Sequence, residues 1–213
     1  MRSTSAVVFA STNAHKLVEM RALLSPYSSL QLKSASTAVR NSDKIGSVEI
    51  HDSYLENAAA KARLVNQGCH YPALADDSGL EVMALEGAPG VRSRRFASLD
   101  GSPSSLDQDS ANNLKLLKAL EGKTDRTARF VCSLALVIEG VMVTAEGTLD
   151  GTIAGAPRGT MGFGYDPLFI PSGETRTLAE MTETEKNKLS HRARALHILM
   201  AKCTAHGIQF AKP

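Results

Sequence analysis

The segment from Thr127 to Gly155 constrains the fold of this chain more than any other. It contains two runs rich in β-branched and apolar residues, FVCSLALVI and VMVTAEGTLDGTI, with Glu139-Gly140 between them. Two such runs joined by a short glycine-containing turn predict a β-hairpin. The fold must therefore contain antiparallel β-structure.

The rest of the chain alternates between strand and helix signals. The run AVVFA, residues 6–10, predicts a strand that leads into a helix through capping side chains. The run PALA before Asp76 predicts a second strand, ending in a polar turn at DDSG. Further helices are predicted at residues 53–67, 108–121 and roughly 183–205, and a surface loop at 87–106. We predict one α/β domain over residues 1–213, with a mixed β-sheet flanked by helices.

The charge balance argues against broad electrostatic binding. Lys and Arg number 24 and Asp and Glu 22, which gives a net charge of +2. The chain has no Trp and only 5% aromatic residues, so single-stranded nucleic acid would find few stacking partners. We expect no nucleic-acid partner, and any strong positive field must be local.

Cysteines and the N-terminal segment indicate a cytoplasmic protein. Cys69, Cys132 and Cys203 are widely spaced and form no CxxC pair, which favours reduced thiols over a zinc site or a disulfide framework. Only five consecutive apolar residues stand near the start, Ala6 to Ala10, too few for a signal-peptide core or a membrane span. We therefore expect no membrane association.

A first candidate site lies where the opening strand enters its helix. The segment consists of Ser11, Thr12, Asn13, Ala14, His15 and Lys16. Backbone N–H groups at a helix start, hydroxyls and a lysine together suit an anion. The segment is not a GxxxxGK[ST] phosphate loop, and the alternative is a plain helix cap with a surface lysine.

A second candidate site is the acidic sequence Asp76-Asp77-Ser78-Gly79. Two acids after an apolar strand place a carboxylate at the rim of the sheet, where open sheets collect ligands. Carboxylates suit Mg²⁺, and Glu56 on the Ala-rich helix is a candidate second carboxylate. The alternative is a turn in which an Asp caps its own backbone.

A third candidate lies around Gly159, Gly162 and Gly164. Glycines permit close approach of the backbone to a flat ligand, on which Phe163 or Tyr165 can stack. The alternative is a glycine-rich turn that carries core aromatics.

A fourth candidate is the basic run KNKLSHRAR, residues 186–194. Thr182 and Glu185 fit a capping box, or Ser190 caps a new helix at His191. In both cases Lys186, His191 and Arg192 lie near a helix start. The alternative is a solvated basic face.

Taken in order, these segments resemble the inosine triphosphate pyrophosphatase family. The matching runs are FASTNAHKLVEM, YLENAAAKA, ALADDSGLEVMALEGAPGVRS, PRGTMGFGYDPLF and AEMTETEKNKLSHRARAL. The resemblance implies an elongated mixed sheet in two α/β lobes, with an active-site cleft between the lobes and usually a homodimer.

The resemblance also implies roles for individual residues. Asp77 matches the catalytic base and Mg²⁺ ligand, Glu56 an acid that helps to hold the metal, and Ser78 a substrate contact. Residues 11–16 match the triphosphate-binding segment. The nucleoside and phosphate contacts it implies are Phe163, Gly164, Tyr165, Asp166, Lys186, His191 and Arg192.

The implied reaction is hydrolysis of the α–β phosphoanhydride of ITP, dITP or XTP to the nucleoside monophosphate and pyrophosphate. His191 and Arg192 are hydrogen-bond donors that suit the six-position carbonyl of these bases and mismatch adenine. The sequence departs from the family at His15, where Gly is common, and at Arg92 and Phe96, where Tyr is usual. A Maf-like pyrophosphatase and a non-catalytic nucleotide sensor or RNA-binding module are the alternatives.

Overall fold

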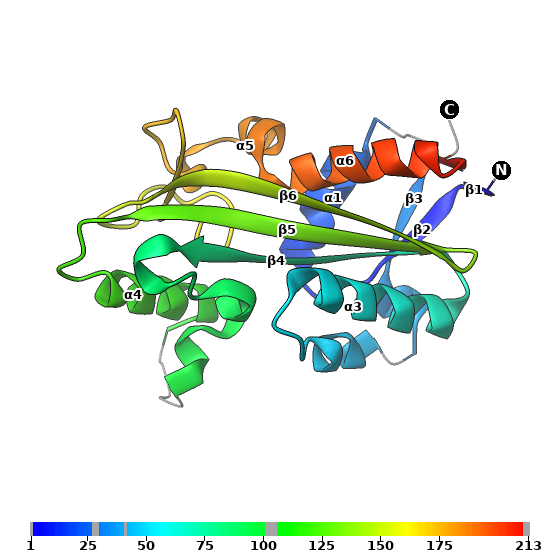
Figure 1. Ribbon diagram of the computed structural model, residues 1–213, viewed down its shortest axis with the longest axis horizontal. Helices are drawn as coiled ribbons and strands as arrows, with labels where there is room; N and C mark the ends of the chain where they lie inside the picture. Colours follow the sequence, from blue (N-terminus) through cyan, green and yellow to red (C-terminus); the bar gives the residue numbers. More distant parts are fainter. Residues whose placement is uncertain (1, 27–29, 41, 101–105, 211–213) are drawn as a thin grey trace. The chain divides into compact units, whose positions relative to one another are not determined.

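The computed structural model describes residues 2–26, 30–40, 42–100 and 106–210, and Figure 1 shows their course. The strands are β1 (Arg2–Thr4), β2 (Ala6–Phe9), β3 (Gln31–Ser34), β4 (Ala73–Val82), β5 (Thr127–Ile138), β6 (Val141–Ile153), β7 (Phe169–Pro171) and β8 (Ile208–Phe210). The α-helices are α1 (Ala14–Leu24), α2 (Ala35–Ala38), α3 (Tyr54–Cys69), α4 (Gln108–Ala119), α5 (Glu183–Leu189) and α6 (His191–Ala205). Short 3₁₀-helices occupy Ser42–Val48, Met83–Leu85, Gly90–Arg95, Ala97–Asp100 and Leu178–Glu180.

The main sheet is mixed, as the sequence predicts. Its strand order is β3-β2-β4-β5-β6-β7, and β1 pairs separately with β8. Strand β2 runs parallel to β3 and to β4, whereas β6 and β7 are antiparallel. The predicted hairpin is present, because Glu139 and Gly140 join β5 to β6 with φ angles of 47° and 77°. Positive φ at both turn residues is the geometry that matches the twist of a tight hairpin.

The chain forms two compact units, and β4, β5 and β6 contribute residues to both. The first unit comprises Met1–Asp77, Cys132–Gly147 and Arg192–Pro213, and the second comprises Ser78–Val131 and Thr148–His191. The cleft expected between two lobes stays a prediction. Each unit has its own hydrophobic core.

In the first unit, alternate residues of each strand face opposite sides of the sheet. Val7 and Phe9 of β2 join a core cluster with residues of α1 and α6, and Val8 joins a cluster with residues of α3. Figure 1 shows α6 and α3 on opposite sides of the strands. Apolar burial on both faces explains why β2 is a continuous apolar run.

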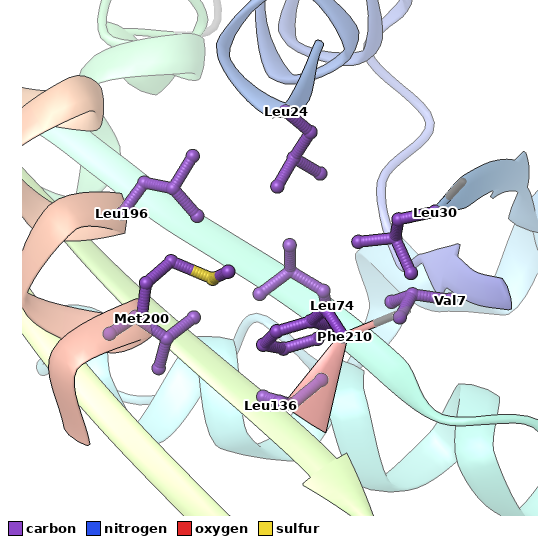
Figure 2. Close-up of a pocket in the computed structure, with 9 residues that line it drawn as sticks. Val7, Leu24, Leu30, Leu74, Leu136, Leu196, Met200 and Phe210 are labelled. Carbon is purple, nitrogen blue, oxygen red and sulfur yellow. The ribbon is translucent and has the colours of Figure 1, made fainter. Parts of the chain in front are cut away.

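A small apolar cavity of about 10 Å³ remains in the core of the first unit. Figure 2 shows leucines from α1, β4, β5 and α6 directed toward one another around it. Phe210 of β8 also lines the cavity. With no polar partner in its lining, the cavity is expected to stay dry.

Two sequence predictions differ from the observed elements. The expected turn at Asp76-Asp77 is absent, because β4 continues through both acids to Val82. The single closing helix is two helices, with Ser190 at φ −62° and ψ 150° between them. The Thr182–Glu185 capping box is present at the start of α5.

Within the described residues, no helix is long and apolar enough to cross a membrane. The three cysteines are free thiols, and Cys132 and Cys203 are buried. The predicted loop at residues 87–106 contains two 3₁₀-helices, and its residues 101–105 lie outside the described part of the chain.

Candidate active site

The start of α1 is capped by the predicted polar residues. Asn13 Oδ1 accepts the Lys16 N–H at 3.2 Å, and Ser11 Oγ accepts the Asn13 N–H at 3.2 Å. The helix begins at Ala14, so His15 lies in its first turn with no left-handed backbone, and Thr12, Ala14 and His15 are exposed. The His15 departure therefore does not force a different backbone here.

Lys16 is not the surface lysine of the plain-cap alternative. Its ammonium lies 2.5 Å from Asp76 Oδ1, and its side chain is only 15% exposed. The other oxygen of Asp76 accepts from Arg192 Nε at 2.9 Å, and Arg192 also pairs with Glu19. This set of Lys16, Asp76, Arg192 and Glu19 is the buried ion-pair network of the first unit.

The two strand acids differ sharply in their electrostatics. Burial alone would raise the pKa of Asp76, but the Lys16 and Arg192 cations outweigh it and hold the pKa far below its usual range. Burial raises the pKa of Asp77, and nearby Lys61 opposes that rise without cancelling it. Asp76 is thus a fixed anion, and Asp77 is the better proton acceptor of the two.

Asp77 is held by α3. Lys61 Nζ donates to Asp77 Oδ1 at 2.8 Å, and Asn57 Nδ2 donates to Asp77 Oδ2 at 3.2 Å. Lys61 Nζ also donates to Glu49 Oε1 at 2.8 Å, so one buried ammonium joins two carboxylates. Burial alone would lower the pKa of Lys61. The nearby Asp77 and Glu49 carboxylates raise the pKa by more than burial lowers it, so the ammonium stays charged.

Glu56 is not part of this arrangement. Its side chain is 65% exposed, and its recorded ion-pair contact is His51 Nδ1 at 3.8 Å. The structure places Glu56 away from Asp77, and the acid joined to Asp77 through Lys61 is Glu49. The metal role expected of Glu56 stays a prediction. Among the described residues, no group of three or more His, Cys, Asp or Glu side chains could hold a metal ion.

Glu49, Asn57 and Lys61 were missed by the sequence reasoning. Asn57 and Lys61 are one helical turn apart, among buried alanines such as Ala58 and Ala62. A lysine on the buried, alanine-rich face of a helix needs an anionic partner, so the position of Lys61 in the sequence could have predicted a nearby acid. Glu49 follows a 3₁₀-helix and stands in no motif, so nothing in the sequence marks it.

In the second unit, Phe163, Asp166 and Lys186 form one cluster. Lys186 Nζ lies 2.5 Å from Asp166 Oδ2 and 4.7 Å from the centre of the Phe163 ring. Asp166 Oδ2 also accepts the Phe163 N–H at 2.9 Å. Lys186 is only 4% exposed, so the solvated-face alternative does not describe it.

One expected substrate contact, Tyr165, lies in the protein interior. Tyr165 is 4% exposed in the core of the second unit, and its hydroxyl donates to Ser93 O at 2.9 Å. Burial raises the pKa of Tyr165, which keeps the phenol neutral. The core-aromatic alternative thus holds for Tyr165, although Phe163 remains half-buried.

Ser190 and His191 belong to the second unit, whereas Arg192 belongs to the first. The His191 ring stacks on Phe130 at 4.8 Å with a 12° angle between the ring planes. Arg192 is 2% exposed, and its guanidinium contacts the carboxylates of Asp76 and Glu19. The guanidinium neutralises buried acids of the first unit, and the expectation that Arg192 reads the base stays a prediction. Ser78 and Gly164 are half-buried in the second unit.

The chain is similar to known proteins over most of its length. Residues 7–202 match the model of the Ham1 family. A protein of Ralstonia nicotianae named dITP/XTP pyrophosphatase is 42% identical over 199 residues, which cover 92% of this chain and 95% of that protein. A protein of the same name from Deinococcus deserti is 49% identical over 162 residues, 74% of each chain. The solved structure of a HAM1 protein from Coxiella burnetii superposes with a TM-score of 0.78 at 37% identity, covering 95% of this chain and 100% of that one.

Proposed function

This chain belongs to the Ham1 family, and from that premise we propose that it is a nucleoside triphosphate pyrophosphatase. It hydrolyses the α–β phosphoanhydride of deaminated purine nucleotides, ITP, dITP and XTP, and releases the nucleoside monophosphate and pyrophosphate. Its role is to remove these nucleotides from the nucleotide pool.

The contact that carries this proposal is the Lys61 bridge between Asp77 and Glu49, 2.8 Å on each side. Asp77 is buried, has a raised pKa and is aligned by two donors from α3. A carboxylate in that state accepts a proton from an attacking water. Binding alone needs no such group, which argues against the non-catalytic sensor.

Asp77 and Glu49 also fit a magnesium ion. Mg²⁺ is usually held by one or two carboxylates together with substrate phosphates and waters. Two carboxylates that already share one buried cation are the donor set such a site requires. When bound, the ion would neutralise triphosphate oxygens and polarise the attacking water.

Residues of the first unit act on the phosphates. The N-terminus of α1 and the Lys16 ammonium supply positive charge, while Asp76 fixes the position of that ammonium at 2.5 Å. These groups stabilise the charge that develops on the pyrophosphate leaving group. Ser11, Thr12, Asn13, Ala14 and His15 form the surrounding backbone segment.

Residues of the second unit act on the base. Phe163 offers a partly exposed ring for stacking, with the Lys186 ammonium beside it. Lys186 is a donor that suits the six-position carbonyl of hypoxanthine or xanthine, whereas the amino group of adenine would face it donor to donor. The His191 ring stacks on Phe130, a residue of the core of the second unit.

The direct test is a substrate panel with the wild-type protein. In the presence of Mg²⁺, we expect pyrophosphate, and not orthophosphate, from ITP and XTP, with kcat/KM for ATP lower by about 10⁴-fold. Preference for uridine or thymidine triphosphate would favour a Maf-like enzyme instead. No release from any nucleotide would favour the sensor. Light scattering on the same sample tests the expected homodimer.

Glu49 and Glu56 provide a matched pair of variants for the metal site. We expect Glu49→Gln to raise the Mg²⁺ concentration that gives half-maximal rate by about tenfold or more, because even the loss of a group that only supports a metal ligand commonly lowers metal affinity by that factor. Glu56→Gln removes the same charge from an exposed side chain and is expected to leave that concentration unchanged. The reverse pattern would return Glu56 to the metal site and remove Glu49 from it.

A further inference from the structure

Helix α4 binds both the backbone N–H and the backbone carbonyl of Gly164, in the glycine-rich segment. Asp109 Oδ2 accepts the Gly164 N–H at 2.7 Å, and Asn113 Nδ2 donates to Gly164 O at 2.9 Å. Asp109 and Asn113 are four residues apart, so they lie on the same face of the helix. The next residue after Phe163 is therefore fixed at its donor and at its acceptor.

The backbone of this segment depends on those contacts. Gly164 has φ +63°, and a Cβ placed there would meet nothing within 4 Å. Glycine is needed at this position for its backbone angle and not for lack of space. Glycine is also the most flexible residue, so its own sequence does not hold Gly164 at this φ angle. The hydrogen bonds from α4 hold it there.

Asn113 is buried at a cost. It is 8% exposed, and its Oδ1 has no hydrogen-bond partner among the described residues. A buried acceptor without a partner is unfavourable, and an apolar residue would cost less on a helix that also buries Ala111 and Leu116. The donation of the Asn113 amide to Gly164 O is the contact that offsets this cost.

The Phe163 ring is set by this same segment. Its own N–H is bound by Asp166, its ring lies beside Lys186, and the following peptide is bound by α4. We propose that Asp109 and Asn113 are positioning residues that set nucleobase selectivity, because they fix the Phe163–Gly164 segment against which the base stacks. This inference rests on the proposed function, since it presumes a base on Phe163.

The test compares Asp109→Ala and Asn113→Ala with wild type. We expect KM for ITP to rise about tenfold, the change that loss of one charge-assisted hydrogen bond produces, with kcat altered less than threefold. The preference for ITP over ATP should fall by a similar factor. Asp109→Asn keeps an oxygen that accepts the Gly164 N–H, so it should restore most of the wild-type KM.

Asn112→Ala is the matched control for a purely structural effect. Asn112 is 1% exposed on the same helix and bonds Ala97 N and Arg94 O, at 2.8 Å and 3.0 Å, in another segment. Its loss should lower the thermal midpoint without changing the ITP to ATP ratio. If Asp109→Ala and Asn113→Ala keep the wild-type KM and ratio, the inference is wrong and the proposed function stands. If the wild type itself shows no preference for ITP, the proposed function fails first.

Discussion

Asp77→Asn should lower kcat for ITP by at least about a hundredfold. The substitution keeps the size and shape of the side chain but removes the charge and the basicity, and general-base groups contribute about 10²–10⁴-fold. Lys61 can still donate to the oxygen of the new amide, whereas the amide nitrogen can no longer accept from Asn57. With the ammonium contact kept, the loss is expected in kcat more than in KM. The measurement is steady-state pyrophosphate release at saturating Mg²⁺.

A fold defect must be separated from a chemical one in this variant. Asp125→Asn is the control, because Asp125 is an exposed acid that binds the Thr127 N–H at 2.8 Å, a bond that asparagine can still make. Asp125→Asn should keep a thermal midpoint close to that of wild type. The kcat of Asp77→Asn is measured well below its own thermal midpoint, because this variant removes the charge of one partner of the buried Lys61 ammonium. A near-wild-type rate for Asp77→Asn would remove Asp77 from the catalytic role.

Asp76 and Asp77 of β4 show which features local sequence patterns predict and which they do not. Apolar runs and turn residues predicted the β5–β6 hairpin, the helices and the mixed sheet, because these follow from near neighbours along the chain. The same reasoning predicted a turn at Asp76-Asp77, since adjacent acids are costly inside a strand. Here β4 continues because Lys16, Arg192 and Lys61 neutralise them, and those cations come from distant parts of the sequence.

The acid that is joined to Asp77 could not be predicted for a related reason. Glu56 was chosen because it stands on a predicted helix next to matching residues, yet it is exposed there. Glu49 reaches Asp77 only through Lys61, a contact made by the way α3 packs on the sheet. Asn57 and Lys61 on the alanine face were the one visible sign that this helix faces buried acids.

Arg192 is expected to be a structural residue with a large effect on stability. Arg192→Met keeps a long side chain but leaves Glu19, which is 7% exposed, without its guanidinium partner, and leaves Asp76 with Lys16 as its main cation. Removing one member of a buried ion pair commonly costs 3–5 kcal/mol, so we expect a fall of about 4 kcal/mol in the free energy of unfolding. Urea unfolding of wild type and variant measures it.

The double variant Arg192→Met/Glu19→Gln separates this role from base reading. If the cost comes from an uncompensated buried acid, neutralising Glu19 should recover about 1–3 kcal/mol of the free energy of unfolding, since a neutral amide costs less to bury than a charge. The ITP to ATP ratio of the folded fraction should then stay near that of wild type, because selectivity depends on Phe163 and Lys186. A loss of that ratio with a cost below about 1 kcal/mol would instead make Arg192 the donor to the base that the sequence predicts.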